Sequence, residues 1–188
     1  MAALTIGRLA KAGILSAFAP GRPSLPLLAR SRRLHMMAAL KQGEITMPDL
    51  VLLPQASGNG YYSYGRPDHQ YGTQKSVDTV LQIARDWFRN QRYEIGVGHL
   101  SLREGGDTPN HSQHERGTHV DLRPIRTDRR PSPVTIHETA YDREETRLLV
   151  QSLLAHRNVK RILFNDAQIA GVVSMAGHDN HLHVEMRA

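Results

Sequence analysis

The sequence contains no cysteine. Disulfide bridges and zinc sites built from thiolates are therefore excluded, while the redox compartment stays open. No apolar run approaches the roughly 18 residues of a membrane-spanning helix, so no integral membrane segment is expected. The 188 residues, 39% of them hydrophobic, suffice for one globular domain with its own core.

Acidic residues are missing from the first part of the chain. Residues 1–43 carry 7 of the 24 Lys and Arg residues and none of the 18 Asp and Glu residues. The rest of the chain is close to neutral, so we expect no nucleic-acid binding from it. We predict a basic tail over residues 1–43, either disordered or a targeting segment, and a globular domain over residues 44–188.

The tail has two competing interpretations. Residues 12–19 are apolar and end in Ala-Phe-Ala, a small-x-small pattern like a signal-peptidase site, although Pro20 follows directly. The Arg-rich, acid-free composition is also typical of an organelle transit peptide. Alternatively, the true start is Met36 or Met37, and the tail is upstream sequence that is read through.

Hydrophobic spacing predicts two helices. Within residues 75–91 apolar residues recur at i, i+3 and i+4, and Ser76 is placed to cap the first turn. Residues 142–156 carry four leucines on one face, and Asp142 and Glu145 open them at the spacing of a capping box. Strands are expected at 47–54, 93–102, 120–122, 159–164, 171–175 and 181–187.

The order of these elements indicates an α+β fold. Helices and strands mix without regular β-α-β alternation, which favours a mainly antiparallel central sheet with flanking helices and long loops. Residues 55–72 are rich in Gly, Tyr and Ser and are expected to form a long surface loop. The tyrosines of this loop serve either packing or stacking on a substrate. They are Tyr61, Tyr62, Tyr64 and Tyr71.

Histidine is concentrated in two places. Six of the eleven histidines lie in the segments 111–121 and 178–183, and an aspartate closes the first segment. Neutral imidazole and carboxylate are the donors of a catalytic zinc site, which uses three protein ligands and leaves a fourth position for water. The two segments together therefore predict a zinc hydrolase.

Local geometry can bring these donors together. His181 and His183 are two residues apart, so in a strand both side chains leave the same face. They either share a metal, or one binds it while the other handles protons. His114 and Asp121 are separated by six residues, and Gly117 allows the chain to turn between them. A loop histidine and a strand aspartate can then converge on one ion.

The pattern Ser112-x-His114-x-x-Gly117-x-x-x-Asp121, followed by His181-x-His183, resembles the signature of the LAS metallopeptidases. That group includes lysostaphin-type enzymes, D-Ala-D-Ala peptidases and the hedgehog signalling domain. A histidine three residues before the first ligand and a His-x-x-His-x-His ending make the chain most similar to the penicillin-insensitive murein endopeptidases. These two features are His111 and the run His178, His181 and His183. The resemblance covers roughly residues 55–188.

The resemblance implies an LAS-like fold with a Zn2+ ion held by three ligands: His114, Asp121 and His183. It implies that His181 is the catalytic base. It places His111 and His178 around the site, where they either orient water, substrate or the oxyanion or form ordinary supporting hydrogen bonds. It gives no role to His119, because the family usually has another residue there.

The resemblance further implies hydrolysis of D-alanyl–diaminopimelate amides in peptidoglycan cross-links, in a periplasmic or other extracytoplasmic location. Two alternatives remain open: a D-Ala-D-Ala dipeptidase or carboxypeptidase, and a non-catalytic zinc-binding module like the hedgehog domain. The chain departs from the murein endopeptidases in having no cysteine and no clean signal peptide. Manganese or iron could also occupy the predicted ligands.

Three further side chains are candidates near the site. Arg123, just past the aspartate ligand, either binds a substrate carboxylate or forms a surface ion pair. Asp166 and Glu185 are alternative partners to orient a ligating histidine. A helical His-Glu-x-x-His motif is absent, so a glutamate base of the common zincin type is not expected.

Overall fold

The computed structural model describes residues 49–55, 58, 60–106 and 113–188. The predicted tail, residues 1–43, and the candidate His111 lie outside these residues. Helices and strands are mixed along the described part of the chain, as expected for an α+β fold. In that part no helix is both long and apolar enough to cross a membrane.

Six strands form the main sheet, in the order β2-β4-β5-β8-β6-β7. Their bounds are Tyr61–Ser63 (β2), Ile95–Val97 (β4), His119–Leu122 (β5), Val159–Leu163 (β6), Val172–Val173 (β7) and Leu182–Met186 (β8). The middle of the sheet, from β4 through β5 and β8 to β6, is antiparallel as predicted. Both outer pairs, β2 with β4 and β6 with β7, are parallel, so the prediction of a mainly antiparallel sheet holds only for its centre.

The segment 55–72 is not the long loop that its composition suggested. It contains β2, a 3-10 turn at Pro67–His69 (η1) and the strand β3, Tyr71–Gly72, which pairs with β1, Val51–Leu52. The reason lies in the tyrosines: Tyr61 is buried in the core, and its hydroxyl donates to the carbonyl of Pro54. Packing thus overrides the loop-like composition of this segment.

The two helices form where the hydrophobic spacing predicted them. Helix α2, Gln74–Gln91, is capped by Thr73, whose hydroxyl accepts from the backbone N–H of Ser76 at 3.1 Å. The cap is therefore Thr73 and not the predicted Ser76. Helix α3, Arg143–Ala155, has the predicted cap, because the Asp142 carboxylate accepts from the N–H of Glu145 at 3.0 Å.

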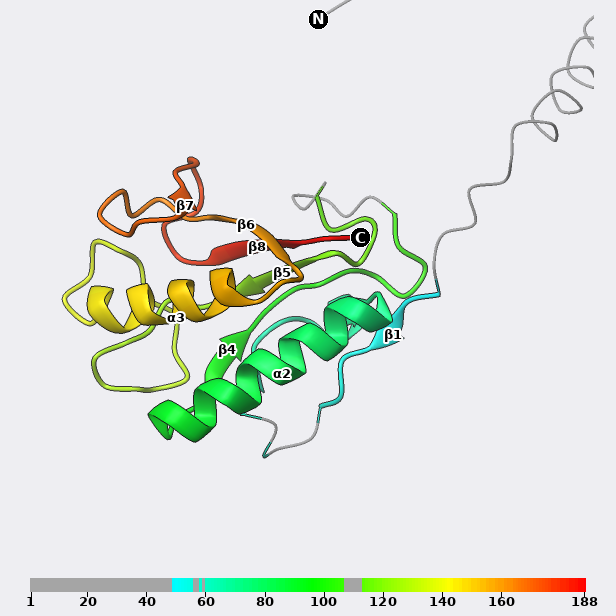
Figure 1. Cartoon of the computed structure of the whole chain (residues 1–188), viewed down its shortest axis with the longest axis horizontal. Helices are drawn as coiled ribbons and strands as arrows, with labels where there is room; N and C mark the ends of the chain where they lie inside the picture. Colours follow the sequence, from blue (N-terminus) through cyan, green and yellow to red (C-terminus); the bar gives the residue numbers. More distant parts are fainter. Residues whose placement is uncertain (1–48, 56–57, 59, 107–112) are drawn as a thin grey trace, which may run out of the picture. The chain divides into compact units, whose positions relative to one another are not determined.

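Both helices lie along one side of the sheet (Figure 1). The helix side chains Val80 and Leu153 line one small cavity together with Val120 and Leu122 of β5. Side chains alternate between the two faces of a strand. Asp121, which lies between Val120 and Leu122, therefore points to the face that the helices leave uncovered.

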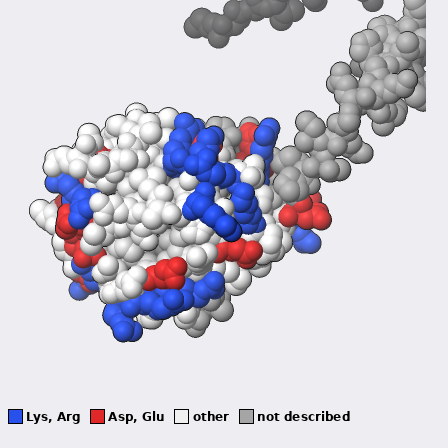
Figure 2. Space-filling view, in the orientation of Figure 1, with Lys and Arg blue, Asp and Glu red and all other residues white. Residues whose placement is uncertain are grey.

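Charged side chains of both signs lie on the face of the molecule shown in Figure 2. Across the described residues several opposite charges pair, among them Lys160 with Glu185 at 2.6 Å and Arg129 with Asp142 at 2.9 Å. Such exposed pairs contribute little to stability individually. They do, however, balance much of the local charge of the surface.

Gly117 holds the loop before β5 against the N-terminal part of the domain. Its φ is +64°, and an added Cβ would lie 2.7 Å from Leu50 Cδ2, 2.9 Å from the Cα of Gly72 and 3.0 Å from the nitrogen of Thr73. Its carbonyl accepts from that same nitrogen at 2.9 Å. The turn that the sequence assigned to Gly117 is confirmed, and the close packing adds a second reason for glycine here.

Replacing Gly117 with alanine is expected to destabilise the protein by about 2–5 kcal/mol in urea unfolding. Left-handed backbone accounts for about 1–2 kcal/mol of this, and the steric overlap for about 1–3 kcal/mol. Gly106→Ala is the matched control, because its φ is +87° but its Cβ would meet nothing within 4 Å. An equal loss of unfolding free energy in the two variants would show that the steric overlap at Gly117 is relieved without an energetic cost.

Candidate metal centre

Asp121 and His183 face each other across the centre of the sheet. They are direct partners in the antiparallel ladder between β5 and β8, and the Asp121 Oδ1 lies 3.0 Å from the His183 Nδ1. Both are almost fully buried, with 5% and 4% of their surface exposed. The ladder therefore fixes this pair with little freedom to move apart.

His114 reaches the same point from the loop before β5. Its Nδ1 donates a hydrogen bond to the backbone carbonyl of Leu100. A carbonyl oxygen can only accept, so the proton is on Nδ1 and the lone pair is on Nε2. That Nε2 lies 3.4 Å from the Asp121 Oδ1. The loop histidine and the strand aspartate thus converge as the sequence predicted.

His114, Asp121 and His183 form a group that could hold a metal ion. One donor atom from each residue lies within 4.8 Å of the others, and all three residues are buried. Two imidazoles and one carboxylate are donors that suit zinc and several other first-row metals. The protonation of His114, with its lone pair turned toward Asp121, fits this use.

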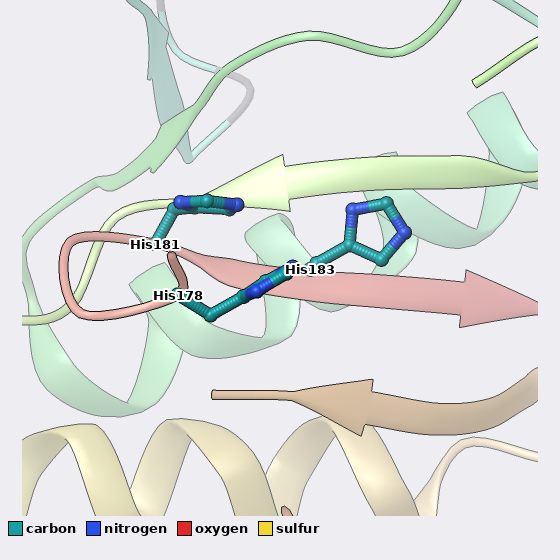
Figure 3. A group of neighbouring side chains, drawn as sticks. All are labelled: His178, His181 and His183. Carbon is teal, nitrogen blue, oxygen red and sulfur yellow. The ribbon is translucent and has the colours of Figure 1, made fainter. Parts of the chain in front are cut away.

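A second group of donors shares one member with the first. His178, His181 and His183 also bring ligand atoms within 4.8 Å of one another. Figure 3 shows His183 on β8, and the other two on the loop that precedes this strand. The His178 and His181 ring centroids are 4.7 Å apart, and the His181 Nε2 lies 3.9 Å from the Asp121 Oδ1. His178 and His181 are thus brought to the site, whereas His111 is outside the described residues.

The electrostatics of the site favour a carboxylate anion beside neutral imidazole. Burial raises the pKa of the Asp121 carboxyl, but the adjacent His114 and His183 rings outweigh burial and hold this pKa well below its ordinary value. Burial lowers the pKa of His181 below 6.5; the Asp121 charge opposes this shift, and the neighbouring histidines add to it. His181 is therefore neutral at pH 7.

His119 is a residue that the sequence did not single out. It lies on the same face of β5 as Asp121, and its Nδ1 is 2.8 Å from the Nε2 of His183. Burial lowers the pKa of His119 to about 4, and the nearby His183 and His114 add to the effect. The sequence did offer one signal, because His119 lies two residues before Asp121 and so on the same face of a strand. The family resemblance, however, gave no role to this position.

The two carboxylates considered as orienting partners have other contacts. Asp166 accepts hydrogen bonds from Tyr141 at 2.8 Å and from Arg143 at 2.7 Å. Glu185 pairs with Lys160 and Arg161 on β6. Neither carboxylate forms a hydrogen bond to His114 or His183 among the described residues, so the expectation that one of them orients a ligating histidine is not supported there.

Arg123 lies two residues after Asp121, on the same side of β5. Its guanidinium stacks on the ring of Tyr64, with 4.1 Å to the ring centroid, and donates to the carbonyl of Pro131 at 3.0 Å. Tyr62, whose ring is 6.0 Å away, and Arg123 line one pocket. No carboxylate among the described residues forms an ion pair with Arg123, so the predicted alternative of a surface ion pair finds no support there.

No family model matches the chain, and no curated protein matches it significantly.

Proposed function

We propose that the protein is a zinc-dependent peptidase of the LAS type that hydrolyses D-alanyl–diaminopimelate amides in peptidoglycan cross-links. One observation carries the proposal: three buried donors, His114, Asp121 and His183, converge beside a further histidine, His181. A purely structural metal site has its coordination closed by protein ligands. A three-donor group with a separate neutral imidazole beside it suits hydrolysis.

The ligand set would be His114 Nε2, an Asp121 oxygen and His183 Nδ1. A zinc ion bound there supplies a water of lowered pKa and polarises the scissile carbonyl. The buried carboxylate and two neutral imidazoles leave the centre with net positive charge. The fit rests on the donor chemistry and on the orientation of His114 by Leu100.

His181 is the proposed base. Its Nδ1 is 2.7 Å from the Oδ1 of Asn180, an oxygen that accepts, so the proton sits on Nδ1 and Nε2 is free to take one. Nε2 is also the atom that faces Asp121. His181 would accept a proton from the attacking water and return it to the leaving amine.

Two other residues complete the proposed site. His178 packs against His181 and could limit the positions open to its ring. Arg123 would contact a substrate carboxylate, because no carboxylate among the described residues pairs with its N–H groups and its guanidinium is held against the ring of Tyr64. A diaminopimelate cross-link carries a free carboxylate on the carbon that bears the leaving amine. The expected location of this activity is extracytoplasmic.

The test is digestion of purified cross-linked muropeptide dimers by the full chain, followed by mass spectrometry of the products. We expect conversion of dimers to monomers, loss of this activity with a chelator, and its return with Zn2+. Release of free D-Ala with dimers left intact would indicate the carboxypeptidase instead. Zinc binding without any hydrolysis would indicate a non-catalytic binding module.

A further inference from the structure

His183 has a different partner at each of its two ring nitrogens. Its Nδ1 lies 3.0 Å from the Oδ1 of Asp121, and its Nε2 lies 2.8 Å from the Nδ1 of His119. The ring is 4% exposed, so water has little access to either nitrogen. The ionised Asp121 can only accept, so unless a cation displaces it the ring proton of His183 lies on Nδ1, and His119 Nδ1 donates to Nε2.

From this arrangement we infer that His119 is a positioning residue, which fixes the tautomer and the orientation of His183 for metal binding. The inference rests on the proposed metal site. A nitrogen that binds a cation carries no proton, and the nitrogen of His183 that faces Asp121 is Nδ1. When a cation takes Nδ1, the ring proton of a neutral His183 must move to Nε2, and His119 Nδ1 must then accept it instead of donating.

The two ligating histidines are held by different kinds of acceptor. His114 donates to a backbone carbonyl, which can never donate in return. His183 faces an imidazole, which can accept or donate according to its own tautomer. Because of this, a side chain at position 119 that offers an acceptor should preserve metal binding, and one that offers no acceptor should weaken it.

His119 is not itself a member of the converging groups. Among the described residues, the donor sets within 4.8 Å include His183 but not His119. Its place in the ladder explains why: it pairs directly with Glu185, and it reaches His183 diagonally. His119 thus contacts the proposed ligand His183 and is not itself a proposed ligand, as expected of a residue that orients a ligand.

The experiment measures the Zn2+ dissociation constant of the full chain by competition with a chelating dye. His119→Leu removes the acceptor and is expected to weaken zinc binding by roughly 10- to 100-fold. His119→Asn places an amide oxygen near the position of Nδ1, and binding within about 3-fold of the unaltered protein is expected on that ground. The control is His156→Leu, which alters a histidine whose Nε2 lies 3.2 Å from the Oε1 of Gln82. This variant should bind zinc with the affinity of the unaltered protein.

A second readout reports the tautomer directly. Long-range proton–nitrogen NMR spectra of the zinc-loaded, unaltered protein should show His183 with its proton on Nε2 and the metal on Nδ1. Metal on Nε2 would overturn the inference, even if His119→Leu failed to fold. Unchanged zinc affinity in a folded His119→Leu protein would overturn it as well.

These outcomes separate the inference from the proposed function. If the unaltered protein binds no zinc, the proposed site and the role of His119 fall together. If it binds zinc but cleaves no muropeptide, the peptidase is wrong and the role of His119 still stands on the affinity and NMR results. If it cleaves and His119→Leu binds zinc normally, only the role of His119 is wrong.

Discussion

His181→Ala is expected to lower kcat for cross-link hydrolysis by roughly 10²- to 10⁴-fold, the contribution typical of a positioned acid–base residue. Zinc should remain bound, because His181 is outside the group of His114, Asp121 and His183. The measurement is a time course of dimer cleavage at saturating substrate, together with the metal content of each sample. The expected signature is a low rate at full zinc occupancy.

The control is His137→Ala, because His137 is an exposed histidine whose Nε2 lies 3.6 Å from Asp179 and which belongs to neither group of converging donors. This variant should keep the rate of the unaltered protein. A His181→Ala protein that cleaved at full rate would remove His181 from the mechanism. A slow variant that had also lost its zinc would instead make His181 a ligand.

Asp121→Asn should weaken zinc binding by more than roughly 100-fold, and hydrolysis should fall with it. The upper end of what an orienting contact contributes is about 100-fold, and a direct ligand that also supplies the negative charge must exceed this. Asparagine keeps the shape of the side chain but removes the charge that Asp121 holds between two imidazoles. The measurement is the same dye competition, with circular dichroism to confirm that the fold persists.

Asp166→Asn is a close control for that variant. Asp166 is as buried as Asp121, at 4% against 5% exposed, but its partners are Tyr141 and Arg143. Its substitution should reduce the free energy of unfolding by about 1.5–3 kcal/mol, the range for hydrogen bonds to a charged group, and leave zinc affinity unchanged. Equal loss of zinc in both variants would show that the effect of Asp121→Asn is general destabilisation.

The elements that position the candidate site could be predicted from local patterns. The spacing of apolar residues predicted α2 and α3, and alternation placed His183 on one face of a strand. Gly117 marked the turn that carries His114 toward Asp121. Each of these signals lies within a few residues of the structure that it specifies, so the sequence alone carries it.

What could not be predicted depends on pairing between distant strands. The contact of His119 with His183 exists because β5 and β8 pair in one register, with Asp121 opposite His183. A shift of that register would give His183 another neighbour. The parallel outer pairs and β2 likewise depend on partners elsewhere in the chain, and the tyrosines of β2 resemble loop residues until their packing is seen.

The main sheet depends on β8, the last strand in the sequence, to join its two parts. β8 follows all other strands in the chain, yet it lies between β5 and β6 and joins the part containing β2, β4 and β5 to the part containing β6 and β7. Asp121 of β5 and His183 of β8 are direct partners in one of the two strand pairings that β8 makes. Until β8 has been synthesised, no strand pairing can join the two parts of the sheet, and the donor set lacks His183. A metal bound by Asp121 and His183 would link β5 to β8. Its release would therefore weaken the pairing of these two strands first.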